Sequence, residues 1–257
     1  MYVERDDLRQ IVVISRNEMK KFIRGRRFQI WAILAAAIFS TITFLPYVFN
    51  SPYENMAGFL SSHFSLIGLL VIIAAALFAA STYVSEFEER TALILFTRPV
   101  KKTTIYIGKF IGCFIIEAVV LIGYYAAMAV AALFLDGAPS VSQYLASFGC
   151  LMLYLFAVSA IAALFSTVMK KFGYAAVMTF FTPFMLIPII SGIIYAANGF
   201  TDFPWYMLDQ ASIAVQACIQ SIPGLDGFSI VNGICAMMAW GAITMLLSWF
   251  VFTRKEM

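Results

Sequence analysis

Three carboxylates stand within four positions of a chain that is otherwise strongly apolar. Glu86, Glu88 and Glu89 belong to the stretch SEFEERTALILFTRPVKKTTIYIGK, residues 85–109, in which basic residues follow the acids. The 257-residue chain is 62% hydrophobic and 12% charged, about half the charged fraction of an ordinary soluble domain. A solvated loop would explain the bases but not the acids, so we expect this segment to bind another protein.

One further carboxylate lies deep within an apolar run. Glu117 is a functional candidate because ionisable residues inside a membrane are costly. It can belong to a translocation path or conformational switch, or it can be a hydrogen-bonded structural residue. Gly108, Gly112, Gly123 and Ala127 of the same run share one helical face, which favours close helix packing. Glu117 lies roughly 140° from that face of the helix.

Other residue types suggest little chemistry. Pro183 and Pro188 are expected to kink an apolar run, which makes them candidates for gating. His63, the single histidine, has no Cys, His or carboxylate at ligand spacing, so we expect neither a metal site nor a catalytic residue. We interpret the four cysteines as small buried hydrophobes, with a disulfide between Cys218 and Cys235 as the alternative.

The lengths of the apolar runs predict an all-α integral membrane protein. A membrane-spanning helix needs about 20 apolar residues. Six runs satisfy this length, namely Phe28–Phe49, Ser61–Val84, Thr104–Leu135, Tyr144–Val168, Tyr174–Ala197 and Ile230–Phe252. We therefore treat residues 1–257 as a single transmembrane domain, with an interfacial segment 1–27, a six-span bundle 28–252 and a tail 253–257.

The distribution of basic residues predicts the orientation of the chain. All 17 Lys and Arg residues fall in segments on one side of the predicted bundle, at 1–27, 90–109, 170–171 and 254–255. Since cytoplasmic loops carry the excess of bases, both termini are expected in the cytoplasm. The acidic stretch is then the first cytoplasmic loop, where a short helix ended by Pro99 would present Glu86, Glu88, Glu89 and Arg90 to the cytoplasm.

Two segments outside the spans also have interpretable patterns. Apolar and basic residues of 1–27 recur at helical spacing, which predicts an amphipathic elbow helix in the inner headgroup region. A calmodulin-like target or a nucleic-acid arm is the less favoured alternative, and we expect no nucleic-acid partner. Aromatics and helix formers in residues 198–229, between spans five and six, predict one or two short helices at the outer interface.

The acidic loop is similar to the first cytoplasmic loop of type-2 ABC-transporter permeases, the ABC-2 class. The shared pattern is an acidic cluster, a Leu-rich helix, Arg-Pro, basic residues and Gly-Lys entering the next span. Members of this class have six spans, cytoplasmic termini, an elbow helix and short outer helices between spans five and six. Arg90 precedes Thr91 here, where the family often has Gly-Thr.

The resemblance implies a function and a set of partners. In this family the acids and the following helix form a coupling helix that sits in a groove of the ATPase subunit. Carried over by position, the coupling residues are Glu86, Glu88, Glu89, Arg90, Thr91, Leu93, Arg98, Pro99 and Lys109. The resemblance favours an exporting permease in the cytoplasmic membrane of a prokaryote. It implies a second permease subunit and two copies of an ABC-type ATPase that bind ATP and Mg.

Alternatives to this interpretation have weaker support in the sequence. Gly108-Lys109 is followed by Phe110 and lacks the upstream glycine of a phosphate-binding loop, so we expect no ATPase site and no cofactor in this chain. An intramembrane serine protease would need a nucleophile with a histidine partner inside the membrane. A stand-alone secondary transporter or channel would normally show an inverted repeat or paired intramembrane charges, and it is the alternative function.

Overall fold

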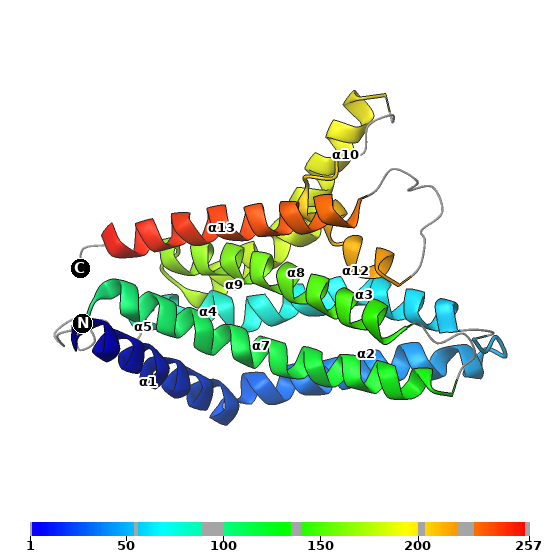
Figure 1. The fold of residues 1–257 in the computed structure, drawn as a ribbon, viewed down its shortest axis with the longest axis horizontal. Coiled ribbons are helices and arrows are strands. Elements are labelled where there is room, and N and C mark those ends of the chain that lie inside the picture. The colour runs from blue at the N-terminus through cyan, green and yellow to red at the C-terminus, as the bar shows by residue number, and fades with distance from the viewer. Residues whose placement is uncertain are drawn as a thin grey trace.

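The protein is an elongated bundle of helices in the computed structural model (Figure 1). The structure describes residues 2–53, 56–88, 100–134, 140–199, 204–219 and 229–254, and no strand occurs among them. The elements are α1 (Tyr2–Arg24), α2 (Arg26–Val48), α3 (Met56–Leu77), α4 (Ala79–Thr82), α5 (Val84–Glu88), α7 (Lys102–Ala132), α8 (Val141–Val168), α9 (Phe172–Phe181), the π-helix η1 (Thr182–Leu186), α10 (Ile187–Ala197), α11 (Leu208–Ala211), α12 (Ala214–Ala217) and α13 (Ile230–Arg254).

The six-span fold class predicted from the sequence is confirmed. Among the described residues, six helices are long and apolar enough to cross a membrane: Arg26–Val48, Met56–Glu86, Lys102–Ala132, Val141–Val168, Phe172–Ala197 and Ile230–Arg254. A separate helix, α1, precedes the first span, and the short helices α11 and α12 lie between spans five and six. The N- and C-terminal ends lie at the same end of the bundle in Figure 1.

Burial divides the six spans into two groups. In the most apolar windows of spans two, three and four, 67%, 56% and 61% of the residues are buried, against 11%, 22% and 28% in spans one, five and six. Span four, α8, is central because it contacts α3, α4, α7, α9, α12 and α13. The core of the protein therefore consists of spans two to four, and the other three spans cover it.

Span two is interrupted twice near its C-terminal end. Phe78 separates α3 from α4, and the hydroxyls of Ser81 and Thr82 donate to its carbonyl oxygen at 2.8 and 3.0 Å. Ser85 is the second residue of α5, so this last helical segment of the span begins before Ser85, at Val84. Hydroxyl groups thus accompany the interruptions of this span.

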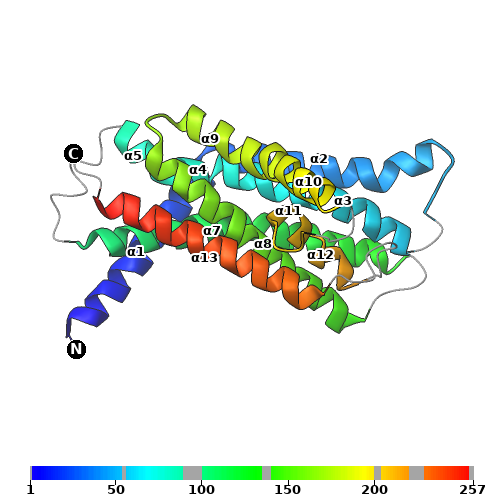
Figure 2. The ribbon, with the colours of Figure 1, turned by 90° about the horizontal axis from the view of Figure 1, so that it is seen from above.

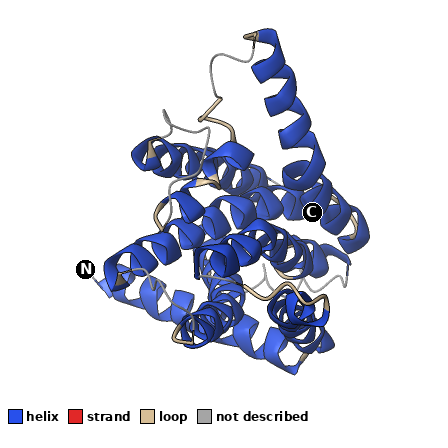
Figure 3. Ribbon diagram, turned by 90° about the vertical axis from the view of Figure 1, so that its right-hand side faces the viewer, coloured by secondary structure: helices blue, strands red, loops and turns tan. Residues whose placement is uncertain are grey.

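Span five contains the break that its prolines predict. The α-helix α9 gives way to the π-helix η1, which contains Pro183, and α10 follows with Pro188 in its first turn. A proline removes a backbone donor, and π-helical turns commonly bend a helix. Figure 1 and Figure 3 show α10 rising away from the rest of the bundle.

The separate helix α1 packs closely against the first half of α7. A Cβ at Gly108 would lie 2.9 Å from Ile14 Cβ, and a Cβ at Gly112 would lie 2.7 Å from the carbonyl oxygen of Ser15. Figure 2 shows α1 crossing this end of the bundle at an angle. These two glycines allow the backbones of α1 and α7 to approach each other.

The other two small residues of that helical face have different surroundings. A Cβ at Gly123 would meet no atom within 4 Å. Gly123 and Ala127 instead border a cavity of about 370 Å³ between α2 and α7. The four small residues therefore divide between a close contact with α1 and an open groove beside α2.

The two glycine environments generate a matched prediction. Gly112→Ala should lower the free energy of unfolding by about 1–3 kcal/mol, because the added methyl group meets the α1 backbone. Gly123→Ala should leave that free energy unchanged or raise it by up to about 1 kcal/mol, because alanine favours a helix and has space here. Chemical denaturation in detergent micelles measures both, and equal stability of the two variants would contradict the docking of α1 on α7.

Candidate functional site

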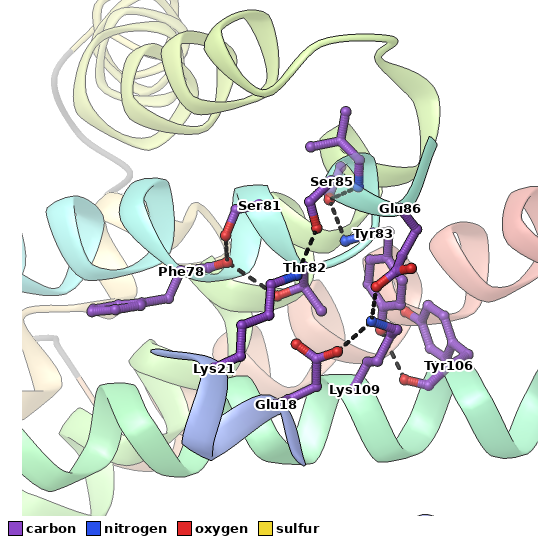
Figure 4. A network of polar contacts seen from close by, with 12 residues as sticks. Glu18, Lys21, Phe78, Ser81, Thr82, Tyr83, Ser85, Glu86, Tyr106 and Lys109 are labelled. Carbon is purple, nitrogen blue, oxygen red and sulfur yellow. Dashed lines mark hydrogen bonds and ion pairs between the residues drawn. The ribbon is translucent and has the colours of Figure 1, made fainter. Parts of the chain in front are cut away.

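A buried lysine joins three elements at the end of the bundle where the chain termini lie. Lys109 of α7 forms an ion pair with Glu18 of α1 and a second one, 2.7 Å long, with Glu86 of α5 (Figure 4). The three side chains are 4%, 9% and 18% exposed, respectively. Because α5 leads into residues 89–99, which contain most of the expected coupling residues, this cluster links that segment to α1 and to span three.

The electrostatics of the cluster are unbalanced. Two carboxylates share one ammonium group, and Glu18 Oε2 is buried without a partner among the described residues. A cavity of about 390 Å³ borders the three charged side chains and is otherwise lined by Arg9, Gln10, Val13, Ile14, Asn17, Val100 and Ile105. Removing charges from water is costly unless they are paired, so Lys109 is the residue that holds the carboxylates together.

Further hydrogen bonds fasten α5 to three other elements. Lys21 of α1 donates to Ser85 Oγ at 3.2 Å, as Figure 4 shows. Glu88 Oε2 accepts from the backbone N–H of Phe172, the first residue of α9, at 3.1 Å. Ser166 of α8 accepts through its hydroxyl oxygen from the backbone N–H groups of Tyr83 and Val84, both at 3.0 Å.

An aromatic contact holds the turn before α5. The Tyr83 hydroxyl donates to the carbonyl oxygen of Tyr106 at 2.9 Å, and the two rings are stacked with their centroids 4.9 Å apart. The ring of Phe252, from span six, lies 5.3 Å from that of Tyr83. Charged, hydroxyl and aromatic contacts together make α5 a firmly attached segment, so a displacement of α5 would move its neighbours.

The coupling residues expected from the sequence are only partly described. Glu89, Arg90, Thr91, Leu93, Arg98 and Pro99 lie outside the described residues. We expected Glu86 to face the cytoplasm, whereas in the structure its carboxylate turns to Lys109. Glu88 is the exposed acid of the described pair. The structure thus distinguishes an inward carboxylate from an outward one.

Glu18 was not singled out in the sequence. It lies on the face of α1 that also carries the buried residues Ser15 and Phe22, at spacings of three and four residues. An acid on the otherwise apolar side of an amphipathic helix is the signal that could have revealed it. Its partner could not be inferred, because Lys109 is 91 positions away.

Glu117 forms a second buried polar cluster, in the middle of the bundle. It is fully buried, and its carboxylate accepts hydrogen bonds from the Ser159 hydroxyl of α8 at 2.5 Å and from the Cys113 thiol at 3.3 Å. The backbone N–H of Ala79, directly after the interruption at Phe78, is a further donor. Glu117 therefore connects span three to span four and to the break in span two.

The remaining candidate residues lie apart from both clusters. Pro183 and Pro188 are in span five. His63 is buried, with Nδ1 at 2.8 Å from the Tyr124 hydroxyl and Nε2 at 3.4 Å from Thr43 Oγ1. Within the described ranges, no group of three or more His, Cys, Asp or Glu residues is arranged to hold a metal ion.

Loss of the buried ammonium should destabilise the protein. Lys109→Met removes the ammonium group that the Glu18 and Glu86 carboxylates share in a buried site, which should lower the free energy of unfolding by roughly 3–5 kcal/mol. Chemical denaturation in detergent micelles measures this change.

A matched variant distinguishes the stability cost of losing a buried lysine from the cost of losing an exposed one. Lys101 pairs with Asp7 at 2.6 Å, but its side chain is 61% exposed. Lys101→Met should therefore cost no more than about 1 kcal/mol. The triple variant Glu18→Gln, Glu86→Gln, Lys109→Met removes the whole cluster and should regain most of the loss. Similar costs for Lys101→Met and Lys109→Met would contradict the central place given to Lys109.

The hydrogen bonds of Glu117 give another prediction. Glu117→Leu should lower the free energy of unfolding by about 1–3 kcal/mol, because the Ala79 N–H and the Ser159 hydroxyl lose their acceptor. Glu117→Gln keeps an acceptor oxygen and should stay within about 1 kcal/mol of the wild type. The same denaturation experiment tests both variants, and a Gln variant as unstable as the Leu variant would show that the charge itself is needed.

Comparison with known families gives an identification that fits this architecture. Residues 8–250 match the family described as ABC-2 family transporter protein. Comparison with curated proteins gave no match. The matched region begins within α1 and ends within α13, so it contains the two buried clusters and nearly all of the six long apolar helices. The protein is therefore a multi-pass membrane permease that belongs to the ABC-2 transporter family.

Proposed function

We propose that this permease is an exporter driven by ATP hydrolysis on separate ATPase subunits. Two copies of an ABC-type ATPase would bind ATP and Mg, and a second permease subunit would complete the transporter. The distribution of basic residues supports a cytoplasmic position for both termini and for the first loop. The membrane that we propose is the cytoplasmic membrane of a prokaryote. The observation that carries the proposal is the attachment of α5 to Lys109, because it gives the loop a mechanical connection to the spans.

The proposed coupling step begins at the segment 86–99. Closure of the ATPases on ATP would displace this segment, with Glu88, Glu89 and Arg90 as the groups that contact the ATPase. Glu86 would transmit the displacement to α7 and α1 through Lys109, and Glu88 would transmit it to α9 through the Phe172 N–H. Charge-paired contacts suit this role because they resist separation in a site shielded from water.

At the interruptions of spans two and five, this displacement would bend the helices and so rearrange the bundle. Span two can bend at Phe78 and Tyr83, where its helical hydrogen bonding is already broken. Glu117 lies against the first of these breaks, which supports a role in switching as well as in stability. Span five can bend at η1, between Pro183 and Pro188, so these prolines are candidates for gating.

The experiment that tests this proposal is affinity copurification in mild detergent at low salt. The wild type should bring down an ABC-type ATPase, identified by mass spectrometry and by ATP hydrolysis in the purified complex. The double variant Glu88→Lys/Glu89→Lys should abolish the association, because it reverses the charge of two acids that we expect to contact the ATPase. It leaves Glu86, and therefore the ion pairs of Lys109, in place.

Glu54→Lys is the matched control, since it reverses an acid in a loop expected on the opposite side of the membrane. This variant should retain the ATPase. A wild type that purifies alone at low salt would overturn the proposal in favour of a stand-alone secondary transporter or channel. Transport by the reconstituted protein, driven by an ion gradient without ATP, would then be the measurement that identifies it.

A further inference from the structure

Two cysteines from distant parts of the chain lie next to each other in the half of the bundle that carries α11 and α12. Cys150 belongs to α8, and Cys218 directly follows α12. Their sulfur atoms are 3.6 Å apart, although the residues are 68 positions apart in the chain. Cys150 is only 3% exposed, whereas Cys218 is partly accessible.

The helix turns that carry these cysteines are held together by a second contact. Ser147 lies three residues before Cys150, and its hydroxyl donates to the carbonyl oxygen of Val215, three residues before Cys218, at 2.6 Å. The Tyr125 hydroxyl lies 2.9 Å from Ser147 Oγ and holds it from the side of α7. The two contacts are one helical turn apart, so α12 is aligned along α8 and the thiols are kept together.

We propose that Cys150 and Cys218 are a disulfide site that closes on the outer side of the membrane. The proposal rests on the orientation given under the proposed function, which places α12 on the non-cytoplasmic side, where disulfides persist. A rotation of the side chains must bring the sulfurs from 3.6 Å to bonding distance. The oxidant would be an external disulfide, either a small molecule or an oxidoreductase.

The reaction is a pair of thiol–disulfide exchanges. The Cys218 thiolate, as the accessible group, attacks the external disulfide and releases one thiol of the oxidant. The Cys150 thiolate then attacks the Cys218 sulfur of the mixed disulfide and releases the second thiol. The new S–S bond forms as the external one breaks, and the two cysteine thiols give up two protons and two electrons to the oxidant.

This pairing differs from the one that the sequence leaves open. The sequence alternative joined Cys218 to Cys235, whereas the structure places Cys218 beside Cys150 and leaves Cys235 exposed on α13. The bond would tie the outer segment to the central helix of the bundle. Because it closes a long loop of the chain, it would restrict the unfolded state and keep α12 docked while the spans move.

Sealed membrane vesicles of both orientations test the site. Right-side-out and inverted vesicles are treated with oxidised glutathione, denatured without reduction, and alkylated with a maleimide. In right-side-out vesicles the wild type should lose two of its four alkylation sites, with Cys113 and Cys235 still labelled. Digestion should then yield a peptide containing Cys150 joined to Cys218, and reduction should restore both sites. Inverted vesicles should keep all four sites reactive.

Two single variants serve as matched controls. Cys235→Ser keeps the pair and should form the same bond, whereas Cys218→Ser should leave Cys150 labelled. Full labelling of the wild type in right-side-out vesicles, or a bond between Cys218 and Cys235, would overturn the proposal. A Cys150–Cys218 bond formed only in inverted vesicles would overturn the outer location and the orientation. ATPase copurification of Cys218→Ser should remain normal, so failure of this site is distinguishable from failure of the proposed function.

Discussion

The burial of one ammonium group between two carboxylates determines how one end of this protein, the end that carries the chain termini, is assembled. Lys109 is nearly inaccessible to solvent, and a buried charge is tolerated only when it is paired. Its partners come from α1 and α5, so both elements must remain docked on α7. Gly108 and Gly112 make this arrangement sterically feasible, because side chains at these positions would prevent α1 from approaching. Helix α1 is therefore packed against the bundle as well as amphipathic.

The same constraint applies to the backbone inside the bundle. Where a membrane helix is interrupted, the freed N–H and C=O groups must find partners within the protein. At Phe78 the carbonyl oxygen accepts from Ser81 and Thr82, and Glu117 reaches the Ala79 N–H on the other side of the break. At Tyr83 the hydroxyl of Ser166 accepts from the backbone. These polar side chains thus lie at the points where the helical hydrogen bonding of span two fails.

The part of the structure that could be predicted is the part that depends on local sequence. Six apolar runs of sufficient length predict six spans, and Pro183 with Pro188 predicts the break that η1 provides. Tertiary partners could not be predicted, because the pattern around a residue does not say which distant residue faces it. The sequence around Glu86 is typical of a solvated acid, but its carboxylate faces a lysine 23 positions further along the chain. The partner of Cys218 is likewise set by how α12 docks on α8.

The contacts that hold the elements together are charged at one end of the bundle and uncharged at the other, and this difference affects which elements can move. At the end that carries the chain termini, separating Lys109 from Glu18 and Glu86 would break two ion pairs in a site shielded from water, which is strongly unfavourable. The elements α1, α5 and α7 should therefore move together, and the interruptions at Phe78 and Tyr83 are where span two can yield. At the opposite end, Ser147 and Cys150 hold α12 against α8 through uncharged contacts. A force applied to α5 would thus reach α7 through ion pairs, and the bending would occur within spans two and five while α8 retains its contacts with α12.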